Sequence, residues 1–361
     1  MKRRQFLTAA GAGAASMVAA PAIAQTAPTI KWRLTSSFPK QLDTIYGTAL
    51  IFSKYVAEAT DGKFEIQCFA AGEIVPGLAA LDAVSNATVE CAQTPTYFYI
   101  GKEPTLGYGT GMPFGLNARQ QHSWWHFAGG GDLINEALAK FNTIAMPIGN
   151  SGCQMGGFFR KEIREVADLN GLKFRVGGYG GRVLAKLGVV PQQVAPGDIY
   201  PALERGTLDA AEFVGPYDDE KLGLHKIAKY YYYPGFWEGG AMMHLCINTA
   251  KWNELPKHYQ AIVRNAAEAA NNWMLAKYDA VNAPALKRIV AGGGELKGFP
   301  VPVMEAALKA TNELNAEIAA TNPLFKKTME SHDAYRGDVL QWWQVGELQF
   351  DTLMVRTRGR S

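Results

Sequence analysis

The most informative stretch of this chain reads Ala167-Asp168-Leu169-Asn170-Gly171-Leu172-Lys173-Phe174-Arg175-Val176. Its first half is rich in turn formers. Its second half alternates apolar side chains with Lys173 and Arg175, which predicts a short strand with one buried face. The two basic residues share the other face, toward solvent or a cleft. A guanidinium offers parallel N–H donors that match a carboxylate, and an ammonium does not. On this pattern alone, Arg175 either binds an anionic ligand or pairs with a nearby acid on an edge strand.

The residues that follow predict further alternation of helices and strands. After two glycines, residues 182–188 are predicted as a helix closed by glycine, and a strand follows. A second short helix covers 198–206, with Asp198 as its N-cap, and residues 207–213 are predicted as a strand.

This order of motifs resembles the solute-binding proteins of tripartite ATP-independent periplasmic (TRAP) transporters of the DctP type. In that family a strand of the pattern L-x-G-L-K-hydrophobic-R, here Leu169 to Arg175, supplies an arginine for the ligand carboxylate. A segment like Y-x-A-L-x-x-G-x-x-D-A-x-E, here Tyr200 to Glu212, follows it. The resemblance extends from about Trp32 to near the C-terminus. It implies an α/β fold of two lobes, the type II-like periplasmic binding protein fold, with a cleft between the lobes and long C-terminal helices.

The first residues have the pattern of an export signal. Arg3 and Arg4 form a twin arginine before an apolar stretch, and Ala22-Ile23-Ala24 matches an A-x-A cleavage site. We predict that residues 1–24 are a Tat-type signal peptide, with the Sec route as the alternative, and that the mature protein is periplasmic. The chain has 36 Lys and Arg against 33 Asp and Glu, and loss of the three basic residues of the signal leaves no net charge. This balance gives no support to a nucleic-acid partner.

Strands and helices also alternate through the first 150 residues, which predicts a mostly parallel sheet. The expected strands are 30–34, 64–69, 89–94 and 143–147, and the expected helices are 44–59, 78–85, 118–126 and 131–140. A strand at 244–248 returns to this unit, and the pattern beyond Leu255 is helical almost to the end. We predict lobe I over 30–149 and 241–275, lobe II over 150–240, and C-terminal helices over 276–361 that complete the lobes and contribute to a dimer.

The candidate ligand-binding residues come from both lobes. Ligands of such sheets bind beyond the carboxyl ends of the strands, which points to Gln93, Thr94 and Tyr97 in lobe I. The resemblance adds residues from lobe II, where Gln154 is expected in a strand over 152–158 whose glycines permit close backbone approach. The full set of predicted substrate-binding residues is Gln93, Thr94, Tyr97, Gln154, Arg175, Phe213 and Glu238.

Two acids in this set, Glu212 and Glu238, would repel an anionic ligand. Burial can hold them protonated, or a bound cation can neutralise them and bridge to the ligand; a third alternative places them in surface or inter-lobe salt bridges. In the 2-oxoacid- and lactate-binding members that the chain resembles, a sodium or calcium ion is held by a glutamine, two acids and a backbone carbonyl. The resemblance therefore implies a metal site of Gln154, Glu212, the Phe213 carbonyl and Glu238, and oxygen ligands suit such hard cations. No organic cofactor is expected.

Three further groups are predicted to be structural. The tyrosines 230–233 are expected to pack with their hydroxyls at a rim. His122 and His126 are spaced to share a helix face, but the sequence shows no third metal ligand. The four cysteines, Cys68, Cys91, Cys153 and Cys246, are expected as small buried thiols, with two disulfides as the alternative.

The C-terminal segment 339–350 carries apolar residues on more than one helical side, so it is either sandwiched within its own chain or docked on another. Because the 2-oxoacid binders that the chain resembles exchange a long C-terminal helix, we predict a homodimer.

The sequence thus predicts a protein that captures a small 2-oxo or 2-hydroxy monocarboxylate by hinge closure and delivers it to TRAP membrane permease subunits. One alternative is a periplasmic enzyme acting on a small carboxylate, but the chain has no GxSxG motif or P-loop, which favours binding without turnover. The other is a TRAP binder of a different organic acid without a metal. Pyruvate, longer 2-oxo acids and lactate all present the same chelating pair of oxygens.

Overall fold

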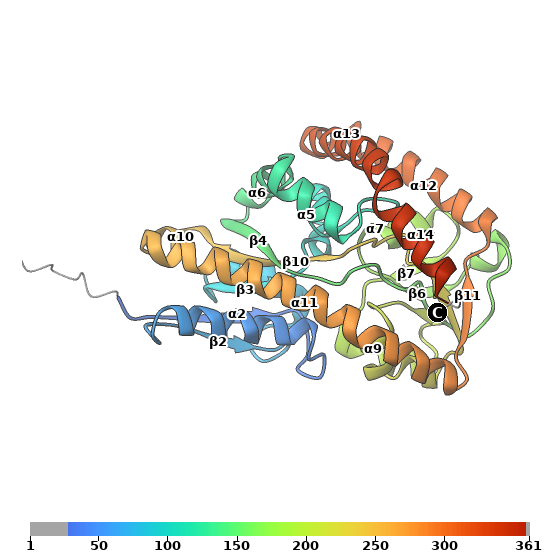
Figure 1. The fold of residues 1–361 in the computed structure, drawn as a ribbon, viewed down its shortest axis with the longest axis horizontal. Coiled ribbons are helices and arrows are strands. Elements are labelled where there is room, and N and C mark those ends of the chain that lie inside the picture. The colour runs from blue at the N-terminus through green and yellow to red at the C-terminus, as the bar shows by residue number, and fades with distance from the viewer. Residues whose placement is uncertain (1–27, 359–361) are drawn as a thin grey trace, which may run out of the picture.

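The computed structural model describes residues 28–358, which fold around two β-sheets (Figure 1). The predicted signal peptide, residues 1–24, lies outside the described residues. The strands are β1 (Ile30–Ser36), β2 (Phe64–Phe69), β3 (Cys91–Thr94), β4 (Thr143–Asn150), β5 (Gly157–Phe159), β6 (Lys173–Arg175), β7 (Val190–Gln192), β8 (Ala210–Ala211), β9 (Tyr230–Tyr233), β10 (Met242–Asn248) and β11 (Glu295–Gly298). The α-helices are α2 (Ile45–Ala59), α3 (Ala80–Ser85), α4 (Gly107–Thr110), α5 (Ala118–Phe127), α6 (Gly130–Ala139), α7 (Gly178–Ala185), α8 (Ile199–Glu204), α9 (Pro216–Lys221), α10 (Thr249–Glu254), α11 (Lys257–Ala291), α12 (Val301–Ala319), α13 (Pro323–Val345) and α14 (Glu347–Thr357).

Both sheets are mixed but mostly parallel, as the sequence predicted. The first sheet has the order β2-β1-β3-β10-β4 and the second the order β11-β9-β5-β8-β6-β7. In the first, β10 runs antiparallel to β3 and β4; in the second, β5 runs antiparallel to β8 and β9. Every residue of β10 is buried, which fits a central strand covered on both faces.

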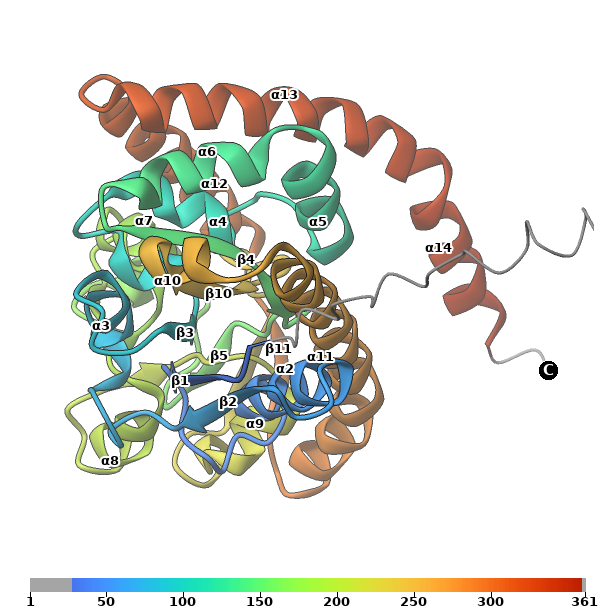
Figure 2. The same cartoon turned by 90° about the vertical axis from the view of Figure 1, so that its left-hand side faces the viewer.

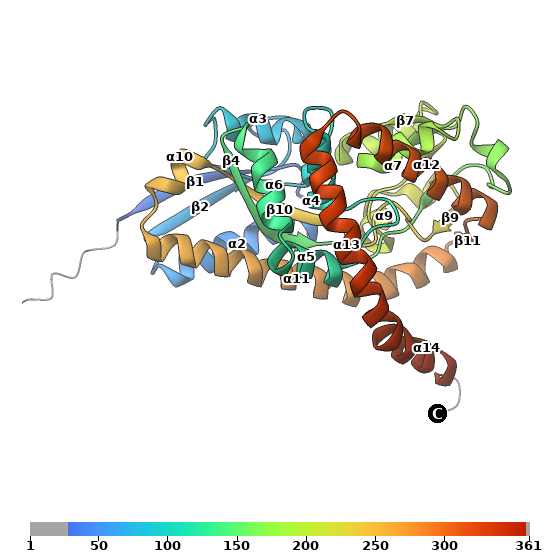
Figure 3. The ribbon, with the colours of Figure 1, turned by 90° about the horizontal axis from the view of Figure 1, so that it is seen from above.

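The chain crosses between the sheets through two segments that lie side by side. Residues 151–156 lead from β4 to β5, and residues 234–241 lead from β9 to β10. The Gln154 N–H donates to the Glu238 carbonyl at 3.1 Å, and the Gly235 N–H donates to the Gln154 carbonyl at 2.8 Å. Helix α11 runs along both sheets as well (Figures 1 and 3), packing against α2, β4 and α9. The two-lobe α/β fold is therefore confirmed, whereas the exact lobe boundaries remain a prediction.

Several predicted strand boundaries were wrong. Residues 151–156, which hold Gln154, form the irregular crossing segment, and the strand comprises only Gly157–Phe159. Gly152 and Gly157 have φ values of +68° and +87°, which a regular ladder does not accommodate. Similarly, β8 comprises only two residues of the predicted strand 207–213.

The helix predicted at 182–188 instead begins at Gly178, so the glycine-rich run opens α7. Strand β11 interrupts the helical C-terminal region and pairs with β9.

The tyrosine run and the cysteines are structural. Tyr231 and Tyr232 are buried in β9, and their hydroxyls donate to Asp219 at 2.6 Å and to the Ile163 carbonyl at 3.1 Å, rather than lining a rim. The four cysteines are free thiols, so the disulfide alternative was wrong. Cys91 and Cys246 are buried as predicted, but Cys153 is exposed.

Two buried acids at the start of α9 fasten this helix to its neighbours. Asp218 accepts a hydrogen bond from the Tyr278 hydroxyl on α11, and Asp219 accepts one from Tyr231. Burial raises the pKa of each acid to about 7. An acid with a raised folded-state pKa holds a proton that the unfolded chain has released, so stability falls as pH rises between the two pKa values.

We therefore expect Asp218→Asn to be more stable than the wild type at pH 8, by on the order of 2–4 kcal/mol. Below pH 3.8, the ordinary pKa of an aspartic acid, protonated Asp218 makes its full contribution to the stability of the wild type. This contribution is lost as the pH rises to about 7, so the stability difference between variant and wild type shrinks toward pH 4. Urea unfolding from pH 4 to pH 8 measures it. Asp279→Asn, at an exposed position of α11, is the control. Parallel pH profiles for wild type and Asp218→Asn would contradict the expectation.

Helix α13 begins against the body of the protein, where Phe325, Thr328 and His332 are buried, and the end of the chain then leaves the body. Helix α13 arches over α5 and α6, and α14 extends outward beyond them (Figures 2 and 3). Large apolar side chains of this region are exposed, including Trp342, Phe350 and Leu353, so segment 339–350 is not sandwiched within the described chain. Between residues 28 and 358, no helix combines the length and apolarity that crossing a membrane requires.

Candidate ligand-binding site

The centre of the site is a buried pair of opposite charges, Arg175 at the end of β6 and Glu212 just after β8. Because β6 and β8 are parallel neighbours, their carboxyl ends bring the two side chains together. Nη1 of Arg175 donates to Oε1 and to the carbonyl of Glu212, each at 2.6 Å. The Arg175 side chain is 1% exposed, and Lys173, which the sequence analysis placed on the same face toward solvent or a cleft, is exposed.

The same pair is held from two further sides. Nε of Arg175 donates to the Val194 carbonyl at 3.2 Å, and the Gly177 N–H at the start of α7 donates to Oε1 of Glu212 at 2.8 Å. Both charged groups are therefore fixed in orientation. Nη2 of the arginine and Oε2 of the glutamate take part in none of these hydrogen bonds.

The two crossing segments add Gln154 and Glu238. Each is 2% exposed, and their backbones are hydrogen-bonded as described above. Nε2 of Gln154 donates to the Ser151 hydroxyl at 3.1 Å, which leaves the amide oxygen for another partner. The sequence showed both residues, but it gave no sign of the supporting Ser151.

Four buried atoms of this group have no hydrogen-bond partner within the described chain. They are Oε1 of Gln154, Nη2 of Arg175, Oε2 of Glu212 and Oε2 of Glu238. Unpaired buried polar atoms cost about 1–3 kcal/mol each, and more when charged, so their coincidence calls for ligands. Three of the atoms are oxygens, the donors that sodium and calcium prefer, and the fourth is an N–H donor suited to a carboxylate.

The electrostatics of the acids agree with this assignment. Burial raises the pKa of Glu212, although Arg175 and the Gly177 N–H oppose the shift. Burial and the neighbouring Glu212 raise the pKa of Glu238 well above its ordinary value. Two carboxylates without a shared cation are therefore unfavourable here, as the sequence analysis anticipated.

Tyr97 covers the site from the first sheet. It belongs to the 3₁₀ helix η2 (Thr96–Tyr99) and is 5% exposed. Its ring packs against the backbone of Gly177 and Gly178: a Cβ at either glycine would lie 2.9 Å from a ring carbon. Burial raises its pKa well above the ordinary value, and the next cause is Glu238. The tyrosine hydroxyl thus remains protonated beside the acids, and larger residues at 177 or 178 would displace the ring.

Gln93 and Thr94 have internal partners. Gln93 accepts from the Ser36 hydroxyl at 2.8 Å and donates to the Ile45 carbonyl at 2.6 Å. The Thr94 hydroxyl bonds to those of Ser37 and Tyr99, each at 2.7 Å. These contacts join β3 to β1 and α2. A ligand role for either residue stays a prediction, beside this structural role.

Phe213 lies next to the arginine. Its ring centroid is 5.5 Å from Cζ of Arg175, and its side chain is 4% exposed.

Asp219 positions Val214, the residue after Phe213, because its carboxylate accepts the Val214 N–H at 3.3 Å. Sequence reasoning missed Asp219, whose only signal was an acid in the first turn of a short helix. It also singled out no role for the indole N–H of Trp237, which is buried without a partner in the described part of the chain.

Residues 35–322 match the DctP family, described as bacterial extracellular solute-binding protein, family 7. The chain belongs to this family. A monocarboxylate 2-oxoacid-binding periplasmic protein from Nostoc sp. is 47% identical over 97% of this chain and 98% of its own length. The TRAP resemblance predicted from the motifs is therefore confirmed.

Solved structures of the family share the fold. A TRAP transporter solute-binding protein from Bordetella bronchiseptica superposes with a TM-score of 0.91 at 49% identity, covering 92% of this chain and 99% of that one. It is described as a mixed-occupancy dimer with copurified calcium and picolinate in one active site and an apo site in the other. A TRAP solute-binding protein from Pseudoalteromonas atlantica, with bound sodium and pyruvate, gives a TM-score of 0.87 at 33% identity and coverages of 89% and 98%.

Membership of this family decides between two classes of function. Its members are extracellular solute-binding proteins, so the protein is a binding component and not an enzyme. The enzyme alternative is not favoured.

Proposed function

We propose that the protein captures a small 2-oxo or 2-hydroxy monocarboxylate in the periplasm, with a bridging sodium or calcium ion, and delivers it to the membrane permease of a TRAP transporter. Arg175 binds the carboxylate through Nη2. Gln154, Glu212, the Phe213 carbonyl and Glu238 hold the cation, which neutralises the acids and gives the ligand oxygens a positive partner. Tyr97 closes the site from the other sheet.

The observation that carries this proposal is the set of four unpartnered buried atoms. Three oxygens and one guanidinium N–H belong to residues from β6, the end of β8 and both crossing segments. A single anion could not satisfy them, because the oxygens would repel it. A cation together with a carboxylate satisfies all four.

The relatives support the ligand class. The Nostoc protein is named for 2-oxoacids, and the two solved structures contain pyruvate or picolinate together with a cation. Pyruvate and picolinate both carry a donor atom next to the carboxylate, so both can chelate one ion. A 2-oxo or 2-hydroxy acid has this same feature.

A thermal-shift screen of small carboxylates, with calcium, with sodium and with neither, tests the proposal. Ligand at a hundred times its dissociation constant adds about 2.7 kcal/mol of stability, a shift that is easily measured. We expect pyruvate or a longer 2-oxo acid to stabilise the protein, and acetate, which lacks the second oxygen, to do so much less. Equal shifts with and without cations would favour the alternative of protonated acids and no metal. No shift with any 2-oxo or 2-hydroxy acid would contradict the ligand class.

We also propose that the protein is a homodimer built through α14. None of the side chains of α14 is buried against the rest of the described chain. Its base is fixed, because Arg119 on α5 pairs with Glu347 and its guanidinium lies 5.5 Å from the Trp343 ring. An apolar helix held away from its own body fits docking on a second copy.

We expect the double variant Phe350→Asp/Leu353→Asp to be monomeric. Burial of each large apolar side chain contributes about 1.5–3 kcal/mol, so the dimer dissociation constant should rise at least about a hundredfold. Light scattering after size-exclusion chromatography measures the mass. Gln349→Asp, which adds a charge at an exposed polar position of the same helix, should remain dimeric. A wild-type protein with the mass of one chain would reject the dimer.

A further inference from the structure

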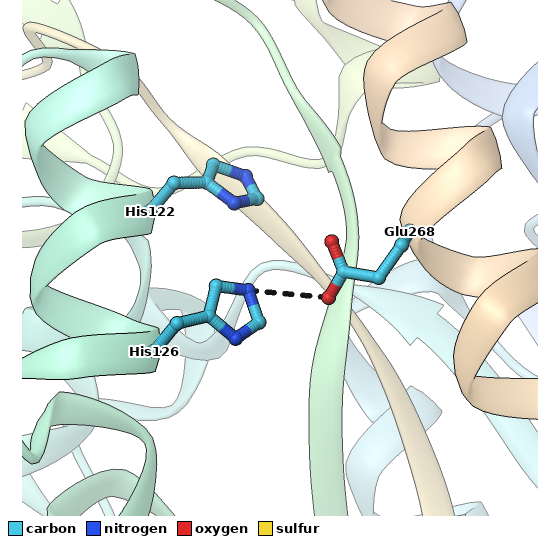
Figure 4. Close-up of side chains that lie close together, drawn as sticks. All are labelled: His122, His126 and Glu268. Carbon is cyan, nitrogen blue, oxygen red and sulfur yellow. Dashed lines mark ion pairs between the residues drawn. The ribbon is translucent and has the colours of Figure 1, made fainter. Parts of the chain in front are cut away.

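Two histidines of α5 face a glutamate of α11. His122 and His126 are four residues apart on the helix, and Glu268 approaches from the opposite side (Figure 4). One ligand atom from each of the three residues lies within 4.8 Å of the others. Nε2 of His126 is 3.2 Å from Oε1 of Glu268. The sequence showed no third candidate ligand, because Glu268 is distant along the chain and only the packing of α5 beside α11 brings it close.

Two polar atoms in or beside the cluster are buried without a hydrogen-bond partner among the described residues. Nε2 of His122 is buried and makes no hydrogen bond to any described residue. Asn271, three residues after Glu268 on α11, lies beside His122, and its Oδ1 is likewise buried without a partner in residues 28–358. A hydrogen bond between the His122 and Asn271 side chains is the alternative to a metal ion on His122.

The ligand chemistry selects a different ion from that of the ligand-binding site. Two imidazoles and one carboxylate suit zinc and neighbouring divalent transition metals, whereas the oxygens around Glu238 suit sodium or calcium. A tetrahedral zinc with ligands at about 2.0–2.1 Å needs its ligand atoms roughly 3.3 Å apart. The His126–Glu268 separation is 3.2 Å, and the three ligand atoms lie within 4.8 Å of one another, so the His122 imidazole would have to move closer to complete the set.

A cavity adjoins the cluster on its outer side. It has a volume of about 470 Å³, and its walls include His126, Glu268, Trp125 and Arg264. Three protein ligands leave a fourth position for water or a small anion, as in zinc sites that exchange their fourth ligand.

We propose that His122, His126 and Glu268 bind a divalent transition metal ion, preferentially zinc, with a fourth position open to this cavity. The ion links α5 to α11. Because α11 packs against both α2 beside the first sheet and α9 beside the second, the ion anchors the α5 region to the helix that joins the lobes. The site shares no residue with the proposed 2-oxoacid site.

Zinc titration of the purified protein, carrying no histidine tag and stripped with a chelator, tests this proposal. Excess calcium is kept in the solution so that the oxygen site does not take up zinc. Isothermal titration calorimetry should give one zinc ion per chain, and cobalt(II) should produce the visible absorption of a four-coordinate site. His126→Ala and Glu268→Gln, both at exposed positions, should each weaken zinc binding at least about 10–100-fold and abolish the cobalt spectrum.

His258→Ala is the matched control, because His258 is exposed on α11 outside the cluster, and it should leave zinc affinity unchanged. Absence of saturable zinc binding, or equal losses in His126→Ala and His258→Ala, would overturn the proposal and leave an ion pair only. Because calcium-dependent pyruvate binding is measured separately on the same samples, failure here is distinct from failure of the 2-oxoacid proposal.

Discussion

Arg175→Lys is expected to weaken 2-oxoacid binding at least tenfold while the protein still folds. Lysine keeps a positive charge beside Glu212, but its three N–H donors lie on one nitrogen. They cannot replace the guanidinium's bonds to the carboxylate and carbonyl of Glu212 and to the Val194 carbonyl and also leave a donor for the ligand. A charge-assisted hydrogen bond contributes about 1.5–3 kcal/mol, which corresponds to roughly 10–150-fold in the dissociation constant. Calorimetric titration with pyruvate measures the effect.

Arg175→Ala should have a larger effect and should also destabilise the protein. Removing one partner of a buried ion pair costs about 3–5 kcal/mol, because Glu212 would remain buried without its cationic partner. Lys173→Ala, at an exposed position of the same strand, is the control and should bind normally. If folded Arg175→Lys protein bound pyruvate within twofold of the wild type, the arginine would not be the carboxylate ligand.

Glu238→Gln is expected to abolish the dependence of 2-oxoacid affinity on sodium or calcium. Because burial and Glu212 raise the pKa of Glu238, glutamine mimics its protonated form, and the fold should be retained. The variant lacks one of the charges that bind the cation. We therefore expect its pyruvate affinity to fall at least about tenfold in the presence of calcium, since a charge-assisted contact is worth about 1.5–3 kcal/mol.

Linkage gives this experiment a second readout. If calcium raises pyruvate affinity by some factor, pyruvate must raise calcium affinity by the same factor. Both factors should approach one in Glu238→Gln. Glu204→Gln, at an exposed position of α8, should retain the wild-type coupling. Wild-type pyruvate affinity that is identical after chelation and sodium replacement would instead support acids held protonated.

The fold was predictable because its signals are local. Alternating apolar residues, glycines at helix ends and helical periodicity predicted the bounds of β1, α2, β2 and α5 closely. The errors fell where the chain departs from regular geometry. At Gly152 and Gly157, positive φ values convert an expected strand into a crossing segment, and periodicity alone does not report such a change.

The sequence predicted which residues belong to the candidate site, but not how those residues are arranged. Arg175 and Glu212 belong to family motifs, so their residue types and spacing were visible in the chain. Their burial and their mutual hydrogen bonds were not, because these depend on β6 and β8 being adjacent parallel strands. For Gln93, the position at the end of a strand suggested a contact with the ligand. In the structure its side-chain amide instead has two hydrogen-bond partners within the protein.

By itself, the sequence determined the family, the alternation of helices and strands and the residues that carry charge at the site, because these follow from residue type and spacing along the chain. The tertiary structure alone decided which polar atoms are left unpaired, that no side chain of α14 is buried within the described chain, and that Glu268 meets His122 and His126. Those properties depend on distances between segments far apart in sequence. Burial then sets their energetic consequence, because it removes the water that would otherwise satisfy each group.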